Sequence, residues 1–324
     1  MLIVQKFGGS SLADGERLRH VAQLCLKRRQ MEQDLVVVVS AMGDTTDILN
    51  TKAREMSGRP PEREMDALMT TGEQQCAALL VMSMEELGLH AVSLTGWQAG
   101  ILTDCNYGDG EIKLIAPARI EEELSRGRIP VVTGFQGICG RGDVTTLGRG
   151  GSDTTAVALA AALEANACEI YTDVDGIYTA DPRLIKDARL LDKIDFRDML
   201  ALSKAGSKVL HHKSVELAMA NGVELILLSS FKEGPGTRLR MLKDFERADF
   251  AGITGRKETG CISIGGKKAD TGSMSNAVML LSDCGIKVKN GSLAENIFTL
   301  EVEKEDFMPA MEILHREFLL GQQK

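Results

Sequence analysis

Short apolar segments alternate with stretches of helical periodicity through the first 230 residues. Some of these segments, such as Val36 to Val39, are apolar at every position, which is typical of strands covered on both faces. The pattern therefore predicts an α/β fold, a three-layer α-β-α sandwich around a mostly parallel sheet. The expected strands are residues 2–7, 35–41, 91–96, 129–135, 169–174 and 223–230, and the expected long helices are 63–87, 152–166 and 207–221.

The pattern changes at a Gly/Pro-rich stretch, residues 232–237, which is typical of the exit from a domain. A charged segment, 241–249, follows it and is expected to be a linker. We therefore predict one domain over 1–240 and a small α+β domain over 250–324. The expected order in the small domain is β-β-α-β-β-α, with strands at 252–257, 261–265, 286–290 and 297–303 and helices at 273–284 and 307–319. In the first domain, a turn signal within 103–114 predicts a small antiparallel excursion.

Composition narrows the classes of function. The chain has 324 residues, 44% of them hydrophobic, and its net charge of −8 argues against nucleic acid as the main partner. No apolar run approaches the roughly 20 residues of a membrane span, and the N-terminus lacks the order of a signal peptide. The seven scattered cysteines predict reduced, mostly buried thiols in a cytoplasmic protein. No group of histidines and cysteines has the spacing of a metal site.

The first expected strand ends in a glycine turn that carries a positive charge. Lys6 precedes Gly8, Gly9 and Ser10, and an amphipathic helix follows. A helix N-terminus presents free backbone N–H groups, and glycines let a phosphate approach the backbone. Plain connections have the same strand–glycine–helix form, so this segment alone leaves both interpretations open.

A second glycine-rich segment, residues 147–153, follows the strand at 129–135. Its sequence, Leu-Gly-Arg-Gly-Gly-Ser-Asp, puts three glycines and Arg149 at a helix start, which favours an anion site. Ser152 or Asp153 could instead serve only as the cap of that helix. The glycine spacing is not that of dinucleotide-binding folds, and the chain has no P-loop motif.

Residues 172–183 follow another strand and offer the ring of Tyr178 and the planar cation of Arg183. The Asp-Gly and Asp-Pro pairs in this segment also fit plain turns. Lys208 is expected in the first turn of a helix, where it opposes the helix dipole and a bound anion would relieve it. The alternative for Lys208 is a solvated surface lysine.

Two Thr-containing segments complete the set. Residues 40–47 follow the second strand, and Thr-Thr-Gly-Glu, residues 70–73, interrupts a helical pattern. A glycine inside a helix lowers helix stability by roughly 1 kcal/mol relative to alanine. Its presence is explained either by a joint between two helices or by a ligand site. Because every segment follows a strand or opens a helix, we expect all of them at one edge of the sheet.

Together these segments resemble the aspartokinases of the amino-acid kinase superfamily. The resemblance covers residues 1–240 almost without gaps, and it implies the amino-acid kinase fold. It also implies ATP-dependent phosphorylation of the side-chain carboxylate of L-aspartate to 4-phospho-L-aspartate, the first step toward lysine, threonine and methionine. The matching segments are Lys-Phe-Gly-Gly-Ser-Ser at 6–11 and residues 40–47, 71–73, 146–155, 172–183 and 206–210.

The resemblance also implies a role for each matching residue. Lys6 and Lys208 would neutralise charge on the transferring phosphoryl group, and Asp153 would orient the lysines. Arg149 would bind a carboxylate with two parallel hydrogen bonds, and Glu73 would pair with the substrate ammonium. A carboxylate nucleophile is already ionised, so no general base is needed. The implied aspartate-binding residues are Thr46, Glu73 and Arg149. The implied nucleotide-binding residues are Gly8, Gly9, Ser10, Thr172, Asp173, Tyr178, Arg183 and Lys208. ATP is expected with Mg²⁺, which would be held mostly by phosphates and water.

The C-terminal part, 250–324, resembles a single ACT-type regulatory unit, and the resemblance implies an amino-acid effector, lysine or threonine, and a homodimer or higher homo-oligomer. Aspartokinases usually carry two such units. The usual Pro-Gly effector turn is also replaced by Lys-Ala-Asp-Thr-Gly-Ser at 268–273. Whether feedback inhibition persists, or the unit serves mainly in dimerisation, stays open.

Three alternatives remain. The first is a kinase for glutamate or acetylglutamate, against which the Thr-Thr-Gly-Glu and Gly-Arg-Gly-Gly-Ser-Asp segments argue. The second is an amino-acid sensor without catalysis, against which the intact Lys6, Arg149, Asp153 and Lys208 argue. The third is a dehydrogenase, which the glycine spacing disfavours.

Overall fold

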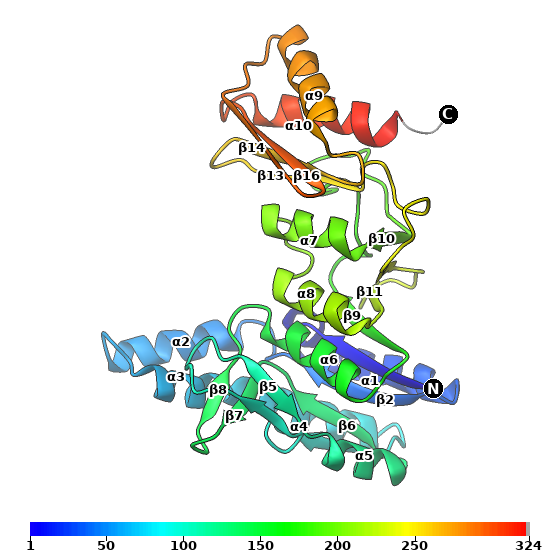
Figure 1. The fold of residues 1–324 in the computed structure, drawn as a ribbon. Helices are drawn as coiled ribbons and strands as arrows, with labels where there is room; N and C mark the ends of the chain where they lie inside the picture. The colour runs from blue at the N-terminus through cyan, green and yellow to red at the C-terminus, as the bar shows by residue number, and fades with distance from the viewer. Residues whose placement is uncertain (322–324) are drawn as a thin grey trace. The chain divides into compact units, whose positions relative to one another are not determined.

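The structure, a computed structural model, describes residues 1–321 and divides into two compact units (Figure 1). The first unit comprises Met1–Val174 and Ala220–Gly234, and the second comprises Asp175–Met219 and Pro235–Lys324. These two units are defined by their compactness and not by their function. The functional domains expected from the sequence, 1–240 and 250–324 with a linker between them, stay a prediction.

The expected parallel sheet forms the centre of the first unit. Six strands lie in the order β11-β9-β1-β2-β6-β3, and every neighbouring pair is parallel. The strands are β1 (Leu2–Phe7), β2 (Asp34–Val39), β3 (Ala91–Leu94), β6 (Ile129–Thr133), β9 (Ala167–Thr172) and β11 (Leu225–Ser229). Each confirms one of the apolar segments predicted to be strands. Their carboxyl ends share one edge, where open α/β sheets bind ligands.

Helices cover both faces of this sheet, so the predicted three-layer arrangement is confirmed (Figure 1). Ile3 and Phe7 of β1 pack in one core with residues of α1 and α4. Lys6 has the opposite parity and faces the other side, where α6 packs on β1 and β9. The helices of this unit are η1 (a 3-10 helix, Gly9–Leu12), α1 (Gly15–Gln30), α2 (Thr45–Met56), α3 (Glu62–Met69), α4 (Thr71–Glu85), α5 (Ala118–Ser125) and α6 (Gly151–Ala162).

The helix expected over 63–87 is two helices, α3 and α4, which meet at Thr70. The Thr70 hydroxyl donates to the carbonyl of Ala67 at 3.1 Å, and the Thr71 hydroxyl donates to that of Leu68 at 2.7 Å. These bonds satisfy carbonyls near the end of α3. The Thr-Thr-Gly-Glu segment therefore forms the helix joint that the sequence leaves open as one alternative.

The predicted antiparallel excursion is confirmed as part of a small second sheet in the first unit. Its order is β5-β4-β7-β8, with β4 (Ile101–Thr103), β5 (Ile112–Ile115), β7 (Gln136–Cys139) and β8 (Val144–Thr146). The prediction of reduced thiols is wrong for two of the seven cysteines, because Cys105 and Cys139 form a disulfide. Pairing of β4 with β7 puts Thr103 opposite Cys139 and so brings Cys105 near. A spacing of 34 residues does not reveal this pairing.

The second unit contains the predicted β-β-α-β-β-α order. An antiparallel sheet, β13-β14-β16-β15, packs with α9 and α10 around a core that includes Ile264, Phe298 and Phe307. The elements are β13 (Gly252–Arg256), β14 (Cys261–Gly265), α9 (Thr271–Asp283), β15 (Asn290–Ala294), β16 (Ile297–Glu301) and α10 (Phe307–His315), which continues as the π-helical η2 (Arg316–Leu320). The unit also contains the parallel pair β10 (Lys193–Asp195) and β12 (Thr237–Arg240), the helix α7 (Phe196–Ala205) and most of α8 (His212–Asn221).

Two predicted elements of this region are wrong in position. The strand expected at 286–290 is β15 instead, because Ile286 is buried in the core directly after α9 and does not join the sheet. β15 is exposed throughout and is fixed by its pairing with β16, so its own composition gives no strand signal. The helix expected over 207–221 begins only at His212.

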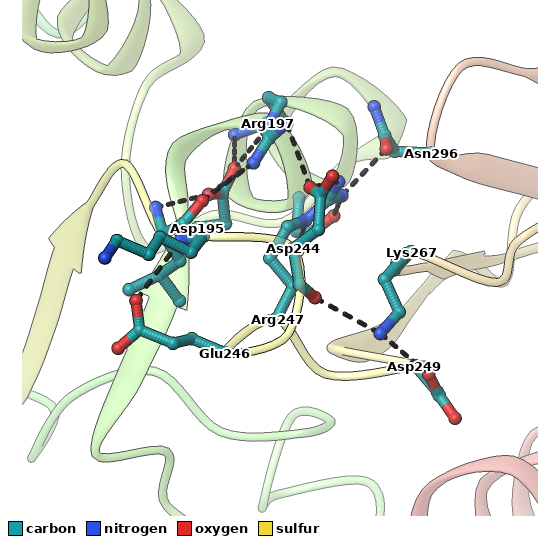
Figure 2. A network of polar contacts seen from close by, with 11 residues as sticks. Asp195, Arg197, Asp244, Glu246, Arg247, Asp249, Lys267 and Asn296 are labelled. Carbon is teal, nitrogen blue, oxygen red and sulfur yellow. Dashed lines mark hydrogen bonds and ion pairs between the residues drawn. The ribbon is translucent and has the colours of Figure 1, made fainter.

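The charged segment 241–249 contains no helix or strand, but buried contacts hold it within the second unit (Figure 2). The Arg247 side chain is 6% exposed and forms an ion pair with the buried Asp198. Arg247 also donates to the Asn296 side chain at 2.8 Å. Moving the segment away would separate the buried pair of Arg247 and Asp198 and leave an uncompensated charge. These contacts therefore hold the segment in place within the unit.

Candidate active site

A cavity of about 320 Å³ opens at the carboxyl edge of the parallel sheet, in the first unit. It lies where β1, β2 and β6 end and where α4 and α6 begin. Its lining consists of Lys6, Gly9, Ser40, Ala41, Gly43, Thr46, Glu73, Phe135 and residues 148–153. Strand exits and helix starts therefore meet as expected at one edge, and five predicted side chains, Lys6, Thr46, Glu73, Arg149 and Asp153, line one space.

An ion pair between Lys6 and Asp153 occupies one wall of this cavity. The Lys6 Nζ and Asp153 Oδ1 atoms are 2.7 Å apart, and the two side chains are only 12% and 15% exposed. Gly150, with φ +77°, is the N-cap residue of α6, and no side chain caps this helix. Ser152 and Asp153 are therefore not helix caps. The Asp153 carboxylate instead fixes the position of the Lys6 ammonium.

Gly9 lets two strand exits approach each other closely. A Cβ atom at Gly9 would lie 2.9 Å from the carbonyl oxygen of Ala41. In the same contact, the Gly43 N–H donates to the Gly9 carbonyl at 3.0 Å. Any side chain at Gly9 would force the β1 and β2 exits apart and would change the shape of the cavity.

Glu73 contributes a buried carboxylate to the cavity lining. Its Oε1 atom accepts the Ala41 N–H at 3.1 Å, while Oε2 has no hydrogen-bond partner within residues 1–321. Burial raises the pKa of Glu73 to about 7. A buried carboxylate with one unused oxygen is suited to receive a cation from a ligand.

We expect the raised pKa of Glu73 to make stability depend on pH in the absence of substrate. Glu73 titrates near 4.5 when unfolded and near 7 when folded, so its proton stabilises the folded state below pH 4.5. That contribution is lost as the pH rises through about 7. Relative to Glu73→Gln, the unfolding free energy of the unmodified protein should fall by on the order of 3 kcal/mol across this window.

Urea unfolding of both proteins at several pH values between 4.5 and 8 would measure this difference. Glu86→Gln, at the exposed C-terminal end of α4, is the matched control and should show the pH dependence of the unmodified protein. Parallel curves for Glu73→Gln and the unmodified protein would contradict the assignment.

Arg149 and Thr46 lie on the more accessible parts of the lining. Arg149 is exposed and stands between Gly148 and Gly150, both of which have positive φ. Such a turn favours glycine on both sides and directs the chain from β8 into α6. Thr46 is half-buried in the first turn of α2. The cavity thus combines an arginine, a hydroxyl and a buried carboxylate with the Lys6 ammonium.

Four of the predicted nucleotide-binding residues lie at the ends of β1 and β9 but outside the cavity lining. The Gly8 N–H donates to the carbonyl of Tyr171 at 3.3 Å, so its backbone donor is already used. Ser10 is exposed at the start of η1. The Thr172 hydroxyl donates to the adjacent Asp173 carboxylate at 3.1 Å.

The remaining nucleotide-binding candidates, Tyr178, Arg183 and Lys208, belong to the second unit. Arg183 makes a two-pronged contact with Asp181, at 3.0 and 2.8 Å, and holds the pKa of that carboxyl below its ordinary value, with a smaller contribution from Lys208. Lys208 is exposed between α7 and α8, four residues before α8 begins. The predicted place of Lys208 in a first helical turn is therefore wrong, and the dipole argument does not apply to it.

Phe135 also lines the cavity, although it is not among the site residues predicted from the sequence. It has φ +70°, unusual for a residue with a side chain, and lies between Gly134 and the start of β7. Its N–H donates to the Thr155 hydroxyl at 3.1 Å, and its ring occupies the space that a Cβ at Gly151 would need. Backbone strain of this kind gathers at functional sites. The predicted strand 129–135 includes Phe135, so the sequence gives no signal that separates it from the strand residues.

Residues 1–321 contain no group of three or more histidines, cysteines, aspartates or glutamates that could hold a metal ion. Within the same residues no helix has the length and apolar character needed to cross a membrane.

Comparison with known proteins agrees with the motifs. The sequence model of the amino acid kinase family matches residues 1–229. The chain is 44% identical to the aspartokinase of Corynebacterium glutamicum over 326 aligned positions, which cover 97% of this chain and 77% of that protein. It is 42% identical to the aspartate kinase of Pseudomonas putida, with 97% and 78% covered.

Solved structures of aspartate kinases also superpose on this chain. The aspartate kinase of Synechocystis superposes with a TM-score of 0.68 at 32% identity, over 98% of this chain and 69% of that one. Escherichia coli aspartokinase III, in complex with aspartate and ADP, has a TM-score of 0.84 at 20% identity, over 99% of this chain and 100% of that one. The second likeness concerns the fold alone.

Proposed function

This chain belongs to the aspartokinases of the amino acid kinase family, and from that premise we propose that it transfers the γ-phosphoryl group of ATP to the side-chain carboxylate of L-aspartate. The products are 4-phospho-L-aspartate and ADP, and the reaction opens the biosynthesis of lysine, threonine and methionine. The observation that carries the proposal is the convergence of Lys6, Glu73 and Arg149 on one cavity.

The charges of the cavity match those of aspartate. The substrate carries one ammonium and two carboxylates, and the cavity offers a buried carboxylate at Glu73 and a guanidinium at Arg149. Glu73 Oε2 receives the ammonium, which keeps Glu73 ionised at neutral pH. Arg149 binds a carboxylate with two parallel hydrogen bonds, and the Thr46 hydroxyl contributes a further one. The other carboxylate is left to face Lys6.

Phosphoryl transfer to a carboxylate depends on position and charge. The attacking oxygen is ionised at neutral pH, so no base has to remove a proton. Lys6, fixed by Asp153, stabilises the negative charge that gathers on the phosphoryl oxygens. Lys208 supplies a second positive charge to the same group, and Asp153 acts by orienting lysine.

ATP is the phosphoryl donor in this proposal. Its phosphates bind at the glycine turn of Gly8, Gly9 and Ser10, and the rest of the nucleotide contacts Thr172, Asp173, Tyr178, Arg183 and Lys208. Mg²⁺ is proposed to accompany the nucleotide and to be held mostly by phosphate oxygens and water.

The C-terminal ACT-type region, 250–324, is proposed to bind an amino-acid effector, lysine or threonine, and to take part in a homodimer or higher homo-oligomer. A solved structure of Escherichia coli aspartokinase III, 23% identical to this chain, is a complex with lysine and aspartate. The cytoplasmic location expected from the cysteine pattern stays a prediction.

A coupled assay of ADP release with aspartate, glutamate and acetylglutamate as separate acceptors tests the proposal. Aspartate should support turnover, and the other two acceptors should give little. Turnover with glutamate but not aspartate would assign the chain to another acceptor. Binding of aspartate and ATP without any turnover would identify a sensor.

A further inference from the structure

A buried carboxylate outside the cavity, Asp66 of α3, joins two distant segments of the first unit. The residue is 1% exposed. Asp66 Oδ2 accepts the Thr146 N–H at 3.0 Å, and Oδ1 accepts the Thr146 hydroxyl at 2.7 Å. The Gly108 N–H donates to both oxygens, at 3.1 and 3.0 Å. One side chain therefore satisfies three donors that lie 42 and 80 residues away along the chain.

No lysine, arginine or histidine within residues 1–321 forms an ion pair with Asp66. Its hydrogen-bond donors are two backbone N–H groups and one hydroxyl. A buried charge without a cation is costly unless hydrogen bonds compensate it, so the three donors and the carboxylate depend on each other. Loss of the carboxylate would leave those buried donors without an acceptor.

Thr146 is the last residue of β8 and stands three positions before Arg149. All of its polar groups are engaged, because its carbonyl accepts the Gly110 N–H at 2.7 Å. The next residue, Leu147, is buried and donates its N–H to the Phe135 carbonyl at 2.9 Å. The turn that carries Arg149 thus starts from a point that Asp66 fixes.

We propose that Asp66 is a positioning residue for aspartate binding: it anchors Thr146 and Gly108 and thereby sets where Arg149 meets the substrate carboxylate. The inference rests on the proposed function, because it needs Arg149 to bind aspartate. Loss of the anchor should affect the binding of aspartate more than that of ATP, because the anchored turn leads into the part of the cavity that holds Arg149.

Asp66→Ala removes all the anchoring bonds. We expect the KM for aspartate to rise about tenfold or more, while the KM for ATP changes less than about twofold. Glu64→Gln, an exposed carboxylate of the same helix, is the matched control and should leave both constants unchanged. A variant with unchanged KM for aspartate, or with both KM values raised equally, would overturn the proposal.

A second pair of variants tests the anchoring role even if Asp66→Ala does not fold. In Asp66→Asn the amide oxygen can accept the two N–H groups, and the amide NH₂ can donate to the Thr146 hydroxyl, so the KM for aspartate should stay within about threefold of normal. Adding Thr146→Val to Asp66→Asn removes the hydroxyl that accepts from the amide. The double variant should therefore have a KM for aspartate about tenfold above that of Asp66→Asn. Equal KM values for the single and double variants would overturn the anchoring role.

Hydrogen exchange separates this inference from the proposed function. If the unmodified protein shows no turnover with aspartate, the function fails, yet the anchoring can still be measured. In Asp66→Ala the amides of residues 146–150 should exchange at least about tenfold faster, while those of β14 do not change. Unchanged exchange at 146–150 would overturn the anchoring whatever the assay shows.

Discussion

Lys6→Ala is expected to lower kcat for aspartate-dependent ADP formation by about a hundredfold to a thousandfold, the effect of removing one preorganised group that stabilises a transition-state charge. The Lys6 ammonium is held 2.7 Å from Asp153 and is largely shielded from water, where its charge is screened less than at the surface. The loss should fall on kcat more than on the KM for aspartate, because the charge it stabilises develops during transfer.

Steady-state kinetics of Lys6→Ala beside Lys52→Ala would measure this effect. Lys52 is an exposed lysine of α2, so its replacement should leave kcat unchanged. A Lys6→Ala protein that keeps its fold and at least about a third of the normal kcat would contradict the role of Lys6 as the main source of transition-state stabilisation.

Arg149→Ala is expected to raise the KM for aspartate by about ten- to a hundredfold, because it removes the charged hydrogen bonds to a substrate carboxylate. The KM for ATP should change little. Arg149→Lys keeps the charge but loses the planar pair of donors, so it should recover only part of the affinity.

Arg141→Ala is the control for Arg149, since Arg141 is an exposed arginine in the turn between β7 and β8. It should leave the KM for aspartate unchanged. Equal KM values for Arg149→Ala and the unmodified protein would remove Arg149 from the aspartate site.

The sequence located the parallel sheet well because its signal is local. Strands buried on both faces need apolar side chains at every position, and runs such as Val36 to Val39 satisfy this without reference to the rest of the chain. The cavity could be predicted from the same rule, because parallel strands end at one edge, where Lys6 is the next-to-last residue of β1 and Ser40 directly follows β2.

The features that escaped prediction depend on partners far away in the sequence. Asp66 is an ordinary acidic residue in a helical pattern until Thr146 and Gly108 fold against it. Cys105 and Cys139 meet only because β4 pairs with β7. β15 is a strand because β16 offers an edge, and the helix predicted to contain Lys208 begins four residues after it.

Chemical identification of the product tests the central claim most directly. An acyl phosphate reacts with hydroxylamine to give a hydroxamate, so the unmodified protein should convert aspartate and ATP in the presence of hydroxylamine to ADP and the side-chain hydroxamate of aspartate in equal amounts. Mass spectrometry would identify that hydroxamate, and Lys6→Ala should form it at the reduced rate given above. Release of ADP without any aspartyl hydroxamate would contradict phosphorylation of the aspartate side chain.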